Sequence, residues 1–485
     1  AEKAIAAIEA GEIPFYPASR KSAILQYYRN LKDWNISRQI PWGIPIPAFV
    51  NVNDSTDWIY DDRVEDKDIV VNGTTYTREE DTFDTWFSSG QWPFITTEYL
   101  DGGELAKYYP TSVLETGHDI LYQWVARMIM LGIYTTGSIP FKDVYLHGLV
   151  LDEHGQKMSK SKGNVINPME ILSEYGSDAL RFGLVSSRSA GQNQAFSTSK
   201  VVAGRNFCNK LWNISRFILD KLGEDFTPQP AQPVTAADHW IVRELNRAHL
   251  DISAQLTGYR IAEAGEAVYH VIWDSVADWY IEASKSQPNP HLLAWALDQC
   301  LRIAHPFAPF VTETIWQTLP WTDSVLILEG WPEEAEYDDI AAEAFTRIQA
   351  LVTEARYVTS ELPGNKRYAM LYQKDTMIEE NAELIRQLAR VSSVTPVDQA
   401  RGLRLAASGR EAWLDIDEDT LYEHQTNLEV RLAETRHKKQ LLEDRLGNEN
   451  YVAKAPEKLV EETRQELIAT DTLITQLVAE LDVLS

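Results

Sequence analysis

The segment from Asp152 to Asn164, "DEHGQKMSKSKGN", concentrates positive charge in a chain that has 72 Asp and Glu against 45 Lys and Arg. Its candidate phosphate-handling residues are Lys157, Ser159, Lys160, Ser161, Lys162 and Gly163. Ammonium groups neutralise phosphate charge, and hydroxyl and glycine residues let backbone N–H groups approach it closely. A solvated Lys/Ser/Gly turn is the alternative, and the neighbouring sequence has to distinguish the two.

A strand, helix, strand pattern leads into this lysine segment. Residues 112–116 are a short buried-strand run, residues 119–134 are helical, and residues 143–151 form a second apolar strand. The pattern predicts parallel strands joined by a right-handed crossover, with ligands bound beyond the carboxyl ends of the strands. The tripeptide "GHD", residues 117–119, follows the first strand, and the lysine segment follows the second.

The overall composition limits the functions open to the chain. With 485 residues, 44% of them apolar, it is long enough for about two to four folded domains. A net charge of -27 excludes broad, non-specific binding to nucleic acid or anionic membranes, so a polyanion must be bound through a few placed cations. No run of about 18 apolar residues is present. Cys208 and Cys300 match no metal-ligand or disulfide spacing and are predicted to be core thiols in a reducing cytoplasm.

The rest of the chain divides by composition. Residues 51–83 are polar and acidic with an Asn-Gly hairpin signal, which is typical of an insertion. Three prolines mark residues 223–235 as a linker, and residues 236–320 have the pattern of an amphipathic helix bundle. Helix and strand signals alternate over residues 321–420. Residues 421–485 contain two heptad runs, and the segment between them begins with Gly and ends with Pro. This pattern predicts an antiparallel helical hairpin.

The pentapeptide "KMSKS", Lys157 to Ser161, is residue for residue a signature of the class I aminoacyl-tRNA synthetases, and the chain resembles the valyl members of that family over nearly its whole length. Five ordered stretches carry the resemblance: "DWNISRQIPWGIPIPAF" (33–49), "DTWFSSGQWPF" (84–94), "YYPTSVLETGHDILYQWVARMIMLG" (108–132), "FKDVYLHGLVLDEHGQKMSKSKGNVINP" (141–168) and "YGSDALRF" (175–182). Residues 301–317 resemble the family's anticodon-binding helices, and residues 446–462 resemble its C-terminal coiled-coil arm.

The resemblance implies roles for particular side chains. Lys157 and Lys160 should contact the ATP phosphates and favour the transition state of adenylate formation over the ground state. The other implied ATP-binding positions are Gly117, Asp119, His147, Gly148, Met158, Ser159 and Ser161. Trp86 and Trp124 should wall the amino-acid pocket, where indole rings offer rigid apolar area to a branched aliphatic side chain. The implied tRNA-binding cations are Arg436, Lys438 and Lys439.

Four residues of this region also fit purely structural explanations. Trp124 lies in an apolar helix and fits a core position. His147 fits a hydrogen-bonded histidine within a buried strand. Asp119 and its neighbour His118 both fit capping of the helix that follows them.

The fold class that the resemblance implies is α/β plus all-α. Residues 1–50 would be the end of the editing insertion and the return segment, and residues 51–222 the second half of a class I Rossmann-type catalytic domain, with the KMSKS loop and helices that contact the tRNA stem. After the linker at 223–235, the remaining parts are a helical anticodon-binding domain at 236–320, a small α/β subdomain at 321–420, and an antiparallel coiled-coil tRNA-binding arm at 421–485.

The implied activity is that of a valine–tRNA ligase, which activates valine with ATP to valyl-adenylate and transfers it to tRNA-Val. The implied partners are therefore valine, tRNA-Val and ATP with Mg²⁺, in a cytoplasmic protein that is a monomer when complete and does not contact a membrane. No protein-bound zinc or other metal is expected, because residues 50–83 contain no cysteine. An isoleucyl or leucyl relative is the near alternative, against which the helical hairpin argues.

One departure from the family pattern affects this interpretation. None of the ten histidines lies in a His-Ile-Gly-His tetrapeptide, which is the first signature of the class. The chain is therefore interpreted as a C-terminal portion that lacks the first catalytic half and most of the editing domain, and that is inactive alone. A non-catalytic tRNA-binding module is the second hypothesis.

Overall fold

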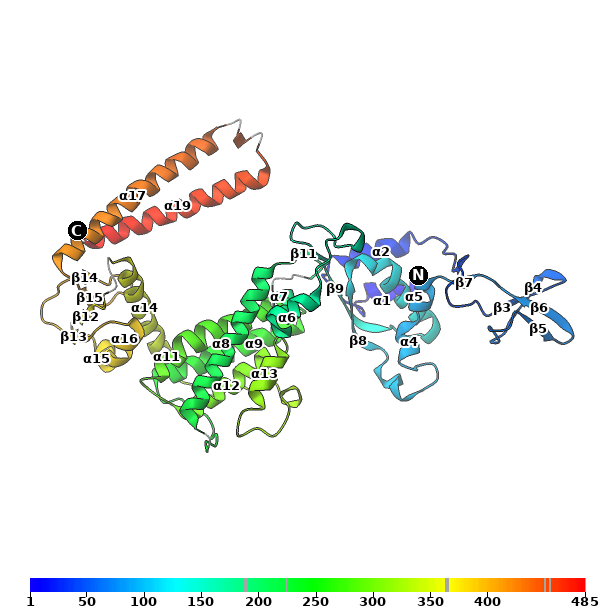
Figure 1. Ribbon diagram of the computed structural model, residues 1–485, viewed down its shortest axis with the longest axis horizontal. Coiled ribbons are helices and arrows are strands. Elements are labelled where there is room, and N and C mark those ends of the chain that lie inside the picture. The colour runs from blue at the N-terminus through cyan, green and yellow to red at the C-terminus, as the bar shows by residue number, and fades with distance from the viewer. Residues whose placement is uncertain (187–189, 224, 363–365, 449–450, 453–454, 485) are drawn as a thin grey trace. The chain divides into compact units, whose positions relative to one another are not determined.

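The structure, a computed structural model, describes residues 1–186, 190–223, 225–362, 366–448, 451–452 and 455–484. It divides into two compact units. The first comprises Ala1–Arg205 and Ser253–Glu266, and the second comprises Asn206–Ile252 and Ala267–Ser485. Parallel sheet, helix bundle, small mixed sheet and helical hairpin are all present (Figure 1), which confirms the predicted α/β plus all-α fold class.

A parallel sheet lies in the first unit (Figure 1). Its strands are ordered β1 (Phe15–Tyr16), β9 (Phe141–His147) and β8 (Thr111–Gly117). β8 and β9 are parallel, as predicted, and their register sets Gly117 opposite His147. Phe141, Val144 and Leu146 of β9 are buried, because they belong to the apolar core of this unit. Both strands therefore end at the same edge.

The crossover from β8 to β9 is helical, as the sequence predicts. A 3-10 turn (His118–Ile120) and a π-helical turn (Leu121–Val125) lead into α5 (Ala126–Thr136). Residues of α5, α1 (Glu2–Glu9) and α2 (Arg20–Arg29) pack with the sheet residues in one apolar core. The fully buried side chains of that core include Ile8, Ile24, Met128, Ile129, Phe141 and Leu146.

The prediction of a single strand over residues 143–151 is wrong, because the segment forms two strands. β9 ends at His147, and β10 (Val150–Leu151) pairs in parallel with β11 (Gln194–Ala195). The break lies at Gly148, where a Cβ atom would stand 1.7 Å from the carbonyl oxygen of Gln192. Glycine is required there because the two backbones approach so closely. The lysine segment therefore follows β10.

The first unit also contains several short elements. A small antiparallel sheet has the order β4 (Asp54–Tyr60), β3 (Ala48–Asn51), β6 (Thr74–Arg78) and β5 (Asp68–Val71), and the predicted Asn-Gly hairpin joins β5 to β6. The other short elements are β2 (Ser37–Arg38), β7 (Thr82–Phe83), α3 (Thr85–Ser89), α4 (Trp92–Thr96), α6 (Pro168–Tyr175) and α7 (Ser177–Val185). Asn167 caps α6 and Pro168 is its first residue.

Residues 198–361 are mainly helical, and the predicted helix bundle at 236–320 lies within them. Their helices are α8 (Thr198–Leu222), α9 (Ala236–Thr257), α10 (Ile261–His270), a π-helical segment (Val271–Tyr280), α11 (Ile281–Ser284), α12 (Pro290–Ala304), α13 (Pro309–Trp316) and α14 (Asp339–Glu361). A mixed sheet follows, with the order β13 (Val394–Pro396), β12 (Ala369–Tyr372), β15 (Ala412–Asp415) and β14 (Leu403–Arg404). The segment between β12 and β13 forms α15 (Thr376–Glu380) and α16 (Ala382–Ala389).

The C-terminal region forms the predicted helical hairpin. α17 (Glu418–Gly447) and α19 (Glu457–Leu484) lie side by side (Figure 1). Heptad residues of both helices meet in one apolar cluster, in which Leu428, Leu432 and Leu477 are buried. Part of the predicted connection, residues 449–450 and 453–454, and the side chain of the predicted heptad residue Leu484 lie outside the described residues.

Among the described residues, no helix combines the length and the apolar character that crossing a membrane requires. The two cysteines differ in environment. Cys300 is fully buried in α12, as predicted, whereas Cys208 is only half-buried. Burial raises the pKa of the Cys300 thiol to about 12.

Cys300 is expected to stay unreactive in the folded protein. Because the pKa of its thiol is raised to about 12, almost none of it is thiolate at pH 8. A Cys208→Ser variant isolates this thiol. Titration with a disulfide reagent at pH 8 should give no fast reaction until urea unfolds the chain, after which one thiol reacts. Full reaction of the native variant within the mixing time would contradict the buried environment.

Candidate active site

The carboxyl ends of β8 and β9 bring four of the predicted nucleotide-binding residues together. Gly117 ends β8 opposite His147, the last residue of β9, and Gly148 follows. Asp119 lies on the 3-10 turn after β8, and its Oδ1 stands 2.7 Å from the position that a Cβ on Gly117 would take. Any side chain at residue 117 would therefore collide with the Asp119 carboxylate.

Hydrogen bonds hold the histidines at this edge. The Nε2 atom of His118 lies 2.9 Å from Oδ1 of Asn193, which also accepts a hydrogen bond of 2.8 Å from the backbone N–H of Leu149. Asn193 therefore ties the end of β8 to the start of β10, and sequence reasoning gave no signal for it. His147 contacts the Gly148 carbonyl oxygen through Nδ1 at 2.8 Å. The capping role considered for His118 is replaced by this contact with Asn193.

The lysine segment meets the strand ends through Lys157. Its Nζ atom lies 3.8 Å from Oδ2 of Asp119, and both side chains are exposed. A short 3-10 turn, Lys160–Lys162, follows and ends at Gly163, whose φ of 67° lies in the left-handed region. Lys160 is exposed, and the structure does not place it against the strand ends. The contact between Lys157 and Asp119 therefore links the loop to the strand-end edge.

The other loop residues predicted to bind ATP are turned toward the loop itself. The Met158 sulfur accepts a hydrogen bond of 3.5 Å from the Ile166 backbone N–H, so its half-buried side chain anchors the loop. The hydroxyl oxygens of Ser159 and Ser161 lie 3.2 Å apart. At the base of the loop, hydrogen bonds led by that from Asn164 hold the pKa of Asp152 below its usual range. That carboxylate is therefore ionised at neutral pH.

Helix α3 links the two tryptophans that are predicted to line the amino-acid pocket. Trp86 lies on α3, and its backbone N–H donates to the Asp84 carboxylate, which caps the helix at 2.7 Å. Trp124 donates its indole N–H to the Ser89 carbonyl oxygen at the other end of α3, at 3.0 Å. Trp124 also packs partly against the core, as the structural explanation proposed. Its N–H nevertheless fixes the helix that carries Trp86.

A buried carboxylate, missed by sequence reasoning, holds the start of α3. Asp84 is 6% exposed and pairs with Arg38, while Nη1 of Arg127 lies 4.0 Å from its Oδ1. The Arg127 guanidinium in turn lies 3.5 Å from the ring centre of Trp34. Asp84 stands within the "DTWF" stretch, but the sequence gives no signal for its two distant arginine partners.

The predicted tRNA-binding cations lie on α17, and two of them form ion pairs across the hairpin. Nζ of Lys438 lies 2.7 Å from Glu466, and Nζ of Lys439 lies 2.6 Å from Asp471 and 3.6 Å from Glu443. Arg436 is exposed. The three cations therefore differ in how much of their charge carboxylates already neutralise.

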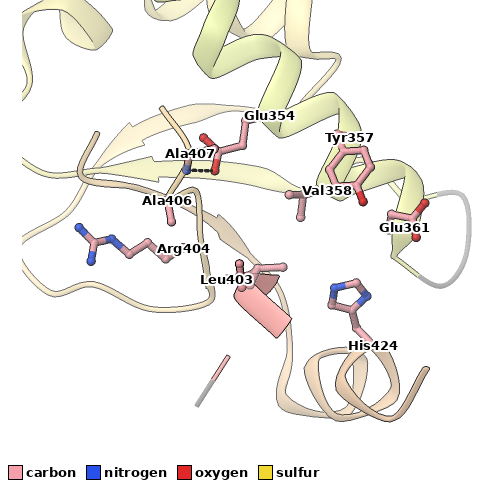
Figure 2. A pocket seen from close by; sticks show the side chains of 10 residues that line it. Glu354, Tyr357, Val358, Glu361, Leu403, Arg404, Ala406, Ala407 and His424 are labelled. Atoms are coloured by element: carbon pink, nitrogen blue, oxygen red, sulfur yellow. Dashed lines mark hydrogen bonds between the residues drawn. The ribbon is translucent and has the colours of Figure 1, made fainter. Parts of the chain in front are cut away.

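A cavity of about 330 Å³ lies between α14, β14 and the hairpin helices, and none of these residues lines it. Figure 2 shows that Val358 and Leu403 line its middle. Its charged residues are engaged within the protein: Glu354 accepts the backbone N–H of Ala407 at 2.6 Å, and Arg404 pairs with Glu411 at 2.7 Å. The described lining of this cavity contains no lysine, so it lacks the ammonium groups expected of a phosphate site.

In the described part of the chain, no group of three or more His, Cys, Asp or Glu residues could hold a metal ion.

Three family models match the chain. Residues 1–197 match "tRNA synthetases class I (I, L, M and V)", residues 238–367 match "Anticodon-binding domain of tRNA ligase", and residues 421–485 match "Valyl tRNA synthetase tRNA binding arm". Together with the parallel sheet and its lysine loop, the first match defines a class I tRNA synthetase. Within that class, the chain belongs to the valine–tRNA ligase family.

The curated relatives agree with this family, and solved structures share the fold. A valine–tRNA ligase of Streptomyces avermitilis is 36% identical over 98% of this chain and 56% of its own length. The chain thus spans about half the length of the curated relatives it matches. A LeuRS–tRNA–LeuAMS ternary complex from Agrobacterium radiobacter is similar with a TM-score of 0.54 and 20% identity, over 74% of this chain and 47% of that one. Mycobacterium tuberculosis methionyl-tRNA synthetase with methionyl-adenylate gives a TM-score of 0.52 and 18% identity, over 65% and 60%. These two structures share the fold.

Gly148→Ala is expected to destabilise the first unit by about 3 kcal/mol or more. The added Cβ would overlap the backbone at Gln192, and moving either backbone segment would itself cost free energy. Gly447→Ala, at the end of α17, is the control because a Cβ there meets nothing within 4 Å. Proteolysis of samples heated to a series of temperatures measures the thermal stability of both variants. Equal melting of the two variants would contradict the close approach.

Proposed function

We propose that this chain supplies the lysine-loop side of the active site of a valine–tRNA ligase, which activates valine with ATP and transfers it to tRNA-Val. The observation that carries the proposal is the meeting of Lys157 with Asp119 beside Gly117 and His147, at the end of two parallel strands. The family membership and the coiled-coil hairpin support the choice of valine. The complete enzyme would work as a monomer in a reducing cytoplasm.

The proposed chemistry is the formation of a mixed anhydride. A carboxylate oxygen of valine attacks the α-phosphorus of ATP, a new P–O bond forms, and the bond to the β-phosphate breaks to release pyrophosphate. Negative charge moves onto the leaving group, where exposed Lys160 and neighbouring Lys157 can neutralise it more strongly than in the ground state. Mg²⁺ bound to ATP would share that charge. The 2′-hydroxyl of the terminal tRNA adenosine then displaces AMP.

Valine-dependent exchange of pyrophosphate into ATP tests this proposal in the complete polypeptide, with the N-terminal part supplied. Lys160→Ala should lower the exchange rate by about a hundredfold or more, since removing one placed cation from such a transition state has effects of that order. Lys3→Ala, an exposed lysine on α1, is the control and should leave the rate unchanged. An exchange rate that does not respond to Lys160→Ala would overturn the assignment.

The isoleucyl and leucyl alternatives are separated by the same assay. Exchange should be faster with valine than with isoleucine or leucine at equal concentrations. A preference for isoleucine or leucine would instead assign the chain to the isoleucyl or leucyl enzymes.

A second candidate function is tRNA binding by this chain without catalysis. The hairpin and its match to a tRNA-binding arm favour it. By resemblance, the bundle would contact the anticodon stem and the hairpin would lie against the tRNA elbow. An acidic chain with a few placed cations predicts a shallow dependence of affinity on salt.

Filter binding of tRNA-Val at several salt concentrations tests this second function. Arg436→Ala should weaken binding and reduce the salt slope by about one, whereas Lys439→Ala should change both less, because two carboxylates already neutralise Lys439. The two variants lie on the same helix, so each controls for the other. Undetectable binding at low salt would count against the tRNA-binding function.

A further inference from the structure

The Asp152 carboxylate organises the first half of the lysine loop. The residue is 8% exposed, directly after β10. Its Oδ1 atom accepts backbone hydrogen bonds from His154 at 3.0 Å and from Gln156 at 2.7 Å. The Asp152 backbone N–H in turn donates to the Gln156 carbonyl oxygen at 2.9 Å. This closed turn lies immediately before Lys157.

The Asn164 side chain connects that turn to the middle of the loop. Its Nδ2 donates to Oδ2 of Asp152 at 2.8 Å, and its Oδ1 accepts the backbone N–H of Ser159 at 2.9 Å. Asn164 is only half-buried, yet both ends of its amide are used. One side chain thus joins the start, the middle and the end of a loop that spans thirteen positions from Asp152 to Asn164.

We propose that Asp152 and Asn164 are positioning residues that clamp the base of the lysine loop and so fix the direction in which Lys160 points. The inference rests on the proposed function, because Lys160 is the group being positioned. Neither residue contacts the strand-end site in this structure; they act through the backbone of Ser159, the residue before Lys160.

Charge repulsion explains why the loop needs such a clamp. Lys157, Lys160 and Lys162 are all exposed and lie within six residues, so their like charges favour a spread-out loop. Gly155 and Gly163 have φ angles of 75° and 67°, and glycine backbones allow many other conformations. The hydrogen bonds of Asp152 and Asn164 oppose both tendencies without covering any lysine.

Exchanging the Asp and Asn side chains between positions 152 and 164 tests whether their hydrogen bond forms the clamp. Asp152→Asn alone sets two amide groups against each other, and Asn164→Asp alone sets two carboxylates against each other. The double variant D152N/N164D restores one donor facing one acceptor. The amide oxygen introduced at position 152 can still accept the two turn N–H groups, and the carboxylate introduced at position 164 can still accept the Ser159 N–H. The four proteins form a double-mutant cycle in which a clamp predicts rescue.

Amide hydrogen exchange in this chain tests the clamp without requiring catalysis. Each single variant should speed exchange of peptides from residues 152–164 by about tenfold, as expected for the loss of buried, charge-assisted hydrogen bonds. The double variant should return close to the parent rate. Asn167→Ala, which removes the N-cap of α6 but no clamp bond, is the matched control and should leave exchange of the loop unchanged. Unchanged exchange in the single variants, or no recovery in the double, would overturn the clamp.

Pyrophosphate exchange in the complete polypeptide then tests positioning. The single variants should lower kcat by about tenfold or more with a smaller change in the KM for ATP, because a misdirected lysine loses contact chiefly in the transition state. The double variant should recover kcat. An active parent whose kcat does not respond to the single variants would overturn the positioning role. Absence of exchange in all four proteins would instead overturn the proposed function, while the hydrogen-exchange result would still decide the clamp.

Discussion

The parallel pairing of β8 with β9 is the constraint on which the candidate site depends. Because the strands run in the same direction and Gly117 stands opposite His147, two distant parts of the chain end at one sheet edge. Parallel pairing requires a long crossover, which α5 and the π-helical turn provide while burying their apolar face on the sheet. The core thus fixes the edge, and the edge fixes the place of Asp119. A loop of lysines attached elsewhere would have no defined partner.

Elements with a local periodic pattern were predictable from the sequence. The strands, the crossover helix, the capped start of α6 at Asn167 and the heptad hairpin all follow from patterns that span a few residues. The lysine loop was predictable for the same reason, because its residue types are contiguous. The break after His147 was not, since it depends on the backbone of Gln192 arriving from another segment.

The supporting side chains of the site could be predicted only in part, because their partners are distant in the sequence. Asp84 pairs with Arg38, 46 residues away, and Asn193 reaches His118 across 75 residues. Nothing in the local sequence specifies such pairs. The residues that the family resemblance names, such as Trp86, lie instead within continuous sequence motifs. The individual roles assigned to these residues stay predictions, whereas their positions in the fold are observed.

An acidic chain with a net charge of -27 can bind phosphate only where its cations remain available. Lys439 is held by two carboxylates, Asp471 across the hairpin and Glu443 on its own helix, and its pKa is raised mainly by the hydrogen bond to Asp471. Lys157 has a single carboxylate contact, to Asp119 at 3.8 Å, and both side chains are exposed. An exposed pair of this kind contributes about 0–1 kcal/mol, whereas a charge-assisted hydrogen bond contributes about 1.5–3 kcal/mol. A triphosphate could therefore displace the Asp119 contact, so in the proposed reaction the ion pair would keep Lys157 near the strand ends without blocking its charge.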